Sequence, residues 1–134
     1  MSLRNRVART LSVMAALLMT ACSRGPAADP AGSSGPADPS RGARLVDQFG
    51  CLNCHSTDGR ARVGPTWKGL AGSKVQLTDG RSVLADPDYL TRAVRDPDAD
   101  IVAGYPPGVM RGAMPPGEIT DADIAAIVAY LESL

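Results

Sequence analysis

The segment Cys51–His55, with the sequence CLNCH, constrains this chain more than any other feature. Two cysteines separated by two residues and followed directly by a histidine are typical of a covalent attachment site for a c-type haem. This spacing lets both thiols reach vinyl groups at one edge of a porphyrin, and the next residue then lies under the iron. We therefore predict that Cys51 and Cys54 attach one haem c covalently and that His55 is an axial ligand of its iron.

The composition agrees with a cofactor that supplies part of the core. Hydrophobic residues make up 44% of the 134 residues, but aromatic residues make up only 4%. Aromatic side chains usually bury large areas in a core, and a porphyrin would supply that missing apolar bulk. The formal net charge is zero, which argues against a nucleic-acid-binding protein because such proteins are basic.

The N-terminus predicts export and lipid attachment. Arginines at positions 4, 6 and 9 precede an apolar run over residues 11–19, the pattern of a secretory signal that is too short to span a membrane. The run ends in Met-Thr-Ala-Cys at residues 19–22, which resembles a bacterial lipobox. Cleavage there would leave Cys22 as a lipidated N-terminus, and two lipid attachments would anchor it stably. The alternative is an ordinary cleaved signal with an incidental cysteine.

Three segments are therefore expected along the chain. Residues 1–21 form the lipoprotein signal peptide, residues 22–39 form a linker that starts at Cys22, and residues 40–134 form one folded domain. The linker is rich in Gly, Pro, Ser and Ala, a composition that favours disorder, and its random-coil reach is about 20–25 Å.

The expected elements of the domain begin with a helix capped by Ser40 and ending at Gly50. A short helix over residues 67–71 and a β-hairpin over residues 74–83, with its turn at Asp79-Gly80, follow it. Asp86 and Pro87 then start a second helix, which ends before Pro97.

Residues 98–119 are expected to form a loop, since they contain four prolines and both methionines of the domain. A loop of this length usually has a functional reason. The last predicted helix starts at Thr120 and buries one apolar face. The residues of that face are Ile124, Ile127, Val128 and Leu131.

The second iron ligand has few candidates. His55 is the only histidine in the chain, so two histidines from one chain cannot bind the iron, and methionine, lysine or an open position remain. Methionine suits an electron carrier because a thioether raises the reduction potential. The methionines outside the signal are Met110 and Met114. We predict Met114, which precedes two prolines that stiffen the loop, with Met110 as the runner-up.

These features together resemble a class I cytochrome c. More narrowly, the sequences GPTWKGL at residues 64–70, Tyr89-Leu90 and IVAGYPP at residues 101–107 are similar to the cytochrome c domain fused to subunit II of bacterial caa3-type oxidases. The resemblance covers residues 41–134. Here the domain follows a lipoprotein-type N-terminus instead of a copper-binding subunit. Met110 follows the oxidase register, and Met114 follows that of small bacterial cytochromes.

The resemblance implies an all-α class I cytochrome c fold, with three to five helices around one haem and a small β-hairpin insertion. It implies His/Met ligation of a low-spin iron and a second-shell hydrogen bond from His55 to the backbone carbonyl of Pro65. It also implies that the first and last helices cross near Gly42, although Val46 stands where that family often has phenylalanine.

The predicted function is one-electron transfer in a respiratory chain, by an electron carrier and not an enzyme. Its expected partners are a quinol-oxidising complex and a terminal oxidase or reductase. The expected location is the periplasmic side of a bacterial envelope, with a lipid anchor in a membrane and no nucleic-acid partner. The main alternative is a haem c subunit of a larger oxidase or dehydrogenase. A gas-binding cytochrome with an open iron position, a zinc clip and a thiol oxidoreductase are further alternatives.

Overall fold

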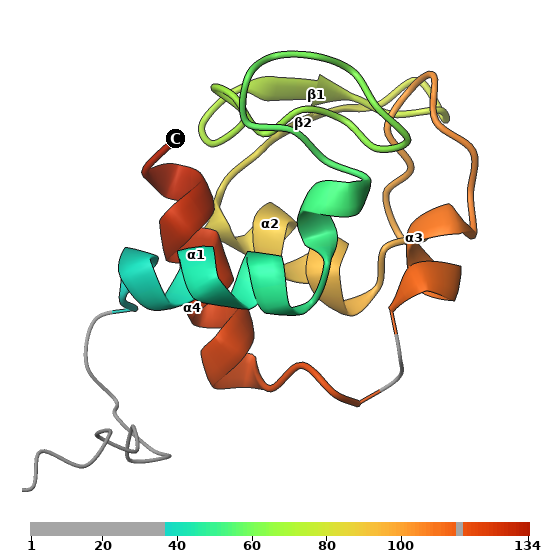
Figure 1. The fold of residues 1–134 in the computed structure, drawn as a ribbon. Helices are drawn as coiled ribbons and strands as arrows, with labels where there is room; N and C mark the ends of the chain where they lie inside the picture. The colour runs from blue at the N-terminus through green and yellow to red at the C-terminus, as the bar shows by residue number, and fades with distance from the viewer. Residues whose placement is uncertain (1–36, 115–116) are drawn as a thin grey trace, which may run out of the picture. The chain divides into compact units, whose positions relative to one another are not determined.

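The computed structural model describes residues 37–114 and 117–134. The predicted signal peptide, Cys22 and most of the predicted linker lie outside these residues. The described elements are α1 (Pro39–Gln48), the short 3-10 helix η1 (Cys51–Asn53), β1 (Lys74–Gln76), β2 (Ser82–Leu84), α2 (Pro87–Arg95), α3 (Val109–Ala113) and α4 (Asp121–Glu132) (Figure 1). A helical domain with one small hairpin confirms the predicted class.

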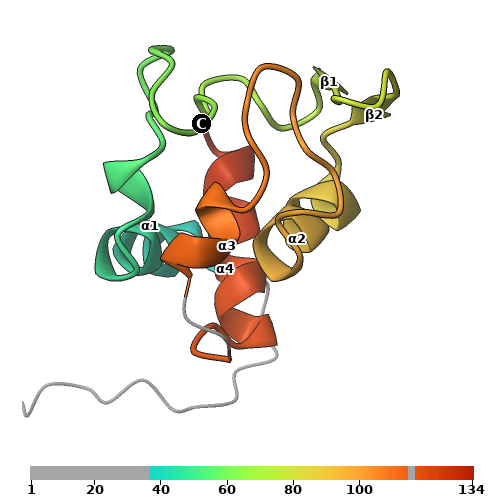
Figure 2. The ribbon, with the colours of Figure 1, turned by 90° about the vertical axis from the view of Figure 1, so that its right-hand side faces the viewer.

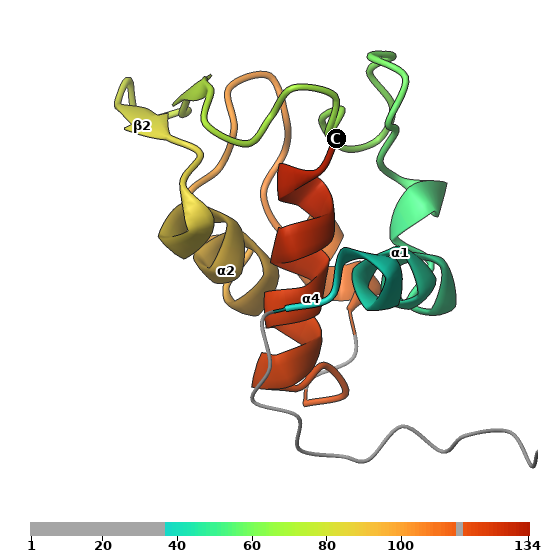
Figure 3. The same ribbon diagram turned by 90° about the vertical axis from the view of Figure 1, so that its left-hand side faces the viewer.

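Helix α4 is the element against which the other long helices pack. It contacts both α1 and α2, which lie on opposite sides of it in Figure 3. Its predicted start is confirmed, because the Thr120 side chain accepts the Asp123 N–H while the Asp123 carboxylate accepts the Thr120 N–H. Its predicted apolar face is buried as well; it consists of Ile124, Ile127, Val128 and Leu131.

The crossing of α1 and α4 depends on the missing side chain of Gly42. A Cβ atom there would lie 2.0 Å from the Ala126 carbonyl oxygen and 2.7 Å from Tyr130 Cβ. This confirms the predicted close approach. Next to the crossing, Val46 is 1% exposed, so the smaller side chain is well packed at this position.

Helix α1 begins earlier than the sequence suggested. Asp38, and not Ser40, is the N-cap, and its carboxylate accepts the Ser40 N–H at 2.9 Å. Pro39 occupies the first turn, where its fixed φ and missing N–H are compatible with a helix. The helix therefore includes the last residue of the predicted linker.

Helix α2 agrees with its predicted limits. Asp86 is the N-cap and accepts the Tyr89 N–H at 2.8 Å, and the helix ends at Arg95, two residues before Pro97. Among the described residues, no helix is long and apolar enough to cross a membrane.

The predicted hairpin is present, with Val75 opposite Val83 in an antiparallel pair. The segment after α2 runs along it, where Leu77 and Val102 form an isolated bridge; in Figure 2 this segment rises beside the hairpin before it descends to α3. Two expectations were wrong. Residues 67–71 form a turn without a helix, and the predicted loop 98–119 contains the helix α3.

Candidate functional site

The two cysteines lie on one tight turn that directly follows α1. The N–H groups of Cys54 and His55 both donate to the carbonyl of Cys51, at 3.2 and 3.0 Å. Gly50, with a φ of 67°, makes the turn into this segment, a conformation that suits glycine because it has no Cβ. Both cysteines are half-buried free thiols, so each has its sulfur available for a covalent bond.

The His55 ring is oriented by the backbone. Its Nδ1–H donates to the Pro65 carbonyl oxygen at 2.8 Å, and this contact is the one that the resemblance implied. Because the carbonyl can only accept, Nδ1 carries the proton and Nε2 keeps its lone pair. Burial lowers the pKa of His55, and the bond to Pro65 offsets this only in part. A neutral imidazole with a free Nε2 is the form that binds a metal.

Hydrogen bonds within the following loop hold Pro65 in place. The Gly64 N–H donates to the Cys54 carbonyl at 2.9 Å, and the Trp67 N–H donates to the Ser56 carbonyl at 2.7 Å. The buried Ser56 hydroxyl also lies 2.9 Å from the hydroxyl of Thr66. Residues 56–67 thus fold back onto the turn that holds the cysteines.

Two residues lie against the His55 ring in a way that the sequence analysis did not predict. A Cβ at Gly64 would lie 2.6 Å from His55 Cε1 and 2.9 Å from Nδ1, so no larger residue fits here without moving the ring. Trp67 stacks on the ring, with centroids 4.8 Å apart and planes 18° apart. The GPTW sequence shows that these residues are close along the chain, but the stack depends on the folded loop.

Both candidate methionines lie in or directly after helix α3. Met110 lies within that helix, Met114 follows it directly, and both side chains are half-buried. Figure 2 shows α3 in front of α4, between α1 and α2. The prolines after Met114 lie outside the described residues.

The arrangement around His55 fits a covalently bound haem. Two free thiols on one turn are followed by a neutral imidazole whose Nε2 has no proton. The residues described hold no group of three or more His, Cys, Asp or Glu side chains that could bind a metal ion. A structural zinc site needs four such ligands, so the zinc clip has no support in this part of the chain.

Comparisons with known proteins show the family of this chain. The cytochrome c family profile matches residues 39–134. Cytochrome c2 of Rhodopila globiformis is 30% identical over 113 residues, covering 77% of this chain and 99% of that protein. Cytochrome c2 iso-1 of Magnetospirillum molischianum is 33% identical over 94 residues, covering 63% of this chain and 89% of that protein.

Among solved structures, cytochrome cH from Methylobacterium extorquens has a TM-score of 0.47 and 22% sequence identity, covering 72% of this chain and 99% of that chain. The family assignment rests on the profile, which spans every element from α1 to α4. This chain therefore belongs to the cytochrome c family, whose members carry electrons on covalently bound haem c.

Proposed function

We propose that this protein is a membrane-tethered, single-haem cytochrome c that passes electrons one at a time in a respiratory chain. The observation that carries the proposal is the Nδ1–H bond from His55 to the Pro65 carbonyl, which leaves Nε2 for the iron. The bound haem supplies a one-electron couple between ferric and ferrous iron. The protein would hold it through Cys51 and Cys54, with His55 as one axial ligand and Met114 as the other.

The protein's own contribution to this function is to keep the imidazole fixed. The Pro65 carbonyl makes the ring more basic and orients it, as is usual for the outer nitrogen of a metal-binding histidine. Trp67 covers one side of the ring, and the ring occupies the space that a side chain at position 64 would need. A ring held in this way needs little rearrangement when an electron arrives or leaves.

The choice between Met114 and Met110 can be tested by the optical spectrum of the purified holoprotein. A ferric iron–thioether bond gives a weak long-wavelength band, which should persist in Met110→Ala and disappear in Met114→Ala. The reverse pattern would make Met110 the ligand. Alanine at Cys51 or Cys54 should weaken or abolish covalent retention of the haem.

The proposed tether rests on the N-terminal sequence. A signal over residues 1–21, a lipidated Cys22 and a linker up to residue 39 would hold the domain, here residues 40–134, on the periplasmic side of a bacterial membrane. Tethering would keep the carrier at a high effective concentration near its partners. Cys22→Ser should release the protein from the membrane fraction without changing its spectrum, and retention of this variant in the membrane would contradict the lipid anchor.

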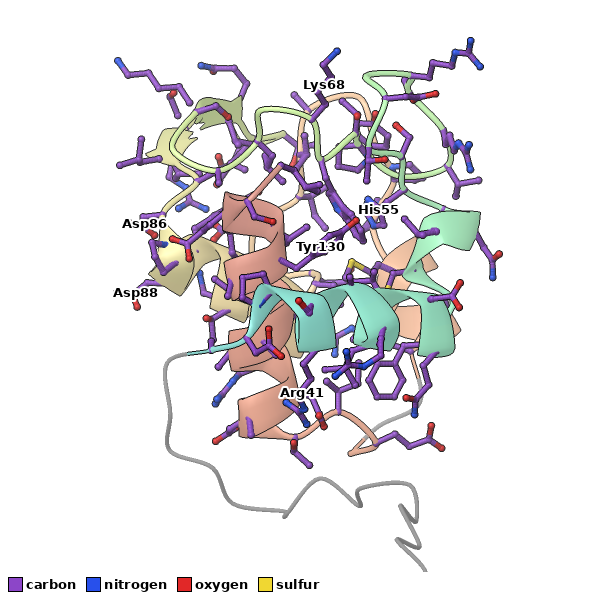
Figure 4. The ribbon with its side chains drawn as sticks, turned by 60° about the vertical axis from the view of Figure 1, so that its left-hand side comes forward. Arg41, His55, Lys68, Asp86, Asp88 and Tyr130 are labelled. Carbon is purple, nitrogen blue, oxygen red and sulfur yellow. The ribbon has the colours of Figure 1, made fainter. Side chains whose placement is uncertain are left out.

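The proposed partners are a quinol-oxidising complex and a terminal oxidase or reductase. Lys68 points outward from the loop that contains Trp67 (Figure 4), and Arg60 and Arg62 are exposed nearby in sequence. Arg60 lies 3.6 Å from the carboxylate of the exposed Asp58, and Arg111 forms ion pairs with Asp96 and Asp98. If Lys68, Arg60 and Arg62 bind an acidic partner surface, electron-transfer rates should fall as ionic strength rises.

A second candidate is a permanent haem c subunit of a larger oxidase or dehydrogenase. The similarity of residues 64–70 and 101–107 to the cytochrome c domain of caa3-type oxidases favours it. Purification from membranes in mild detergent distinguishes the two: a subunit stays with its complex, whereas a carrier elutes alone.

A further inference from the structure

Helix α3 carries Met110 and is followed directly by Met114, and its side chains are exposed or half-buried. None of its residues is buried, and Val109 at its start is 42% exposed. The Gly108 N-cap has a φ of 80° and provides no side-chain cap. Polar contacts with the segment after α2 help to hold this helix in place.

Those contacts come from the segment that follows α2. The Arg111 Nε–H donates to Asp98 Oδ2 at 2.6 Å, and a terminal nitrogen of Arg111 donates to Asp96. Asp98 Oδ1 also accepts the Gly108 N–H at 2.8 Å. The Asp98 carboxylate thus binds α3 at its N-cap, Gly108, and at its middle, Arg111. The Arg111 guanidinium in turn binds the carboxylates of both Asp98 and Asp96.

The geometry is more favourable than that of an ordinary surface ion pair. Single exposed pairs contribute little, but networks with several well-aligned bonds are the recognised exception. The Asp98 side chain is 26% exposed, and the bonds from Arg111 and Gly108 hold its pKa below the usual range. Pro97, between the two carboxylates, limits the flexibility of the segment that presents them.

We propose that Asp98, with Arg111 and Asp96, forms a clasp that holds the methionine segment near the iron and sets how readily the sixth ligand is displaced. The three are positioning residues, since none is proposed to touch the haem. This inference rests on the proposed methionine ligation. Without the clasp, the population in which the methionine is detached should rise, and an added ligand should bind with a higher apparent affinity in proportion.

The test is the binding of imidazole to the ferric holoprotein. Binding is measured by the disappearance of the long-wavelength thioether band as imidazole is added. Asp98→Asn and Arg111→Gln should each bind imidazole about five- to tenfold more tightly than the parent protein. The double variant should change imidazole affinity by less than the product of the two single effects, because both single changes remove the bond between Arg111 and Asp98. Arg41→Gln is the control, since it removes an ion pair with Asp123 between α1 and α4, and it should leave imidazole affinity within about twofold of the parent.

Urea unfolding of the same proteins separates positioning from general stability. If Arg41→Gln lowers stability as much as Asp98→Asn but leaves imidazole affinity unchanged, the clasp acts on the ligand. If the clasp variants bind imidazole as weakly as the parent, or if the control binds it as tightly as they do, the clasp proposal is overturned. A parent protein that lacks the thioether band would overturn the methionine assignment itself, and the clasp with it.

Discussion

The helix crossing at Gly42 gives the sharpest stability prediction. Alanine there would place its Cβ 2.0 Å from the Ala126 carbonyl oxygen, which is 1.4 Å less than the 3.4 Å at which ordinary contact begins. The atoms within 2.7 Å also include the Ala126 carbonyl carbon, and backbone atoms cannot rotate out of the way. The two helices must therefore move apart.

The cost follows from that separation. Overfilling a packed core lowers the free energy of unfolding by about 1–3 kcal/mol. Because the neighbouring atoms are rigid, we expect Gly42→Ala to cost about 3 kcal/mol, at the upper end of that range. The better helix propensity of alanine offsets about 0.5–1 kcal/mol. A net loss of about 2 kcal/mol corresponds to a Tm lower by roughly 8–16 °C for a domain of this size.

Thermal and urea unfolding of the ferric holoprotein, followed by far-ultraviolet circular dichroism, measure this loss. Arg44→Ala is the matched control, because Arg44 is exposed on the same helix and its loss should change stability by no more than about 0.5 kcal/mol. If Gly42→Ala unfolds at the same temperature as the parent, the two helices do not approach as closely as the structure shows, and the reasoning fails.

Three further outcomes are expected. Gly64→Ala should lower the free energy of unfolding by about 1–3 kcal/mol, since the new Cβ displaces the His55 ring; an unchanged urea midpoint would contradict this. Burial would raise the pKa of Asp123, but hydrogen bonds from Thr120 and the charge of Arg41 lower it overall. Its contribution to stability is thus present above the unfolded pKa and is lost as the pH falls through the folded pKa. Urea midpoints of Asp123→Asn should consequently fall less than those of the parent on acidification, and parallel curves would refute this. The protein without haem should be largely unfolded, because haem binds only the folded state. A cooperative unfolding transition of the apoprotein would contradict this prediction.

Features encoded by local sequence were predictable. The apolar spacing and the Thr120 cap define α4, and Asp86-Pro87 defines the start of α2, because capping and periodicity act over a few residues. The CLNCH segment likewise predicts the haem attachment residues by spacing alone. The contact between His55 and Pro65 came from the family resemblance, and the structure contains it.

Features that depend on the folding of loops were not predictable. The stack of Trp67 on His55 requires the loop between them to fold back, and hydrophobic periodicity carries no information about that. Arg111 and Asp98 are 13 positions apart, and no local sequence pattern indicates that their side chains pair. The start of α1 was misplaced for a simpler reason, since Pro39 was assigned to the linker although proline is favoured in a first helical turn.

The contact between α1 and α4 also has a consequence for the order in which the protein can fold. Arg41 donates to the Ala122 carbonyl across 81 positions of sequence, so the crossing closes only after almost the whole chain is available. A chain that ends before Thr120 keeps every predicted haem-binding residue, yet α1 and α2 lose the helix against which both pack. Contacts between residues so distant in sequence slow folding. Until α4 packs against α1, the CLNCH segment is not part of a folded domain.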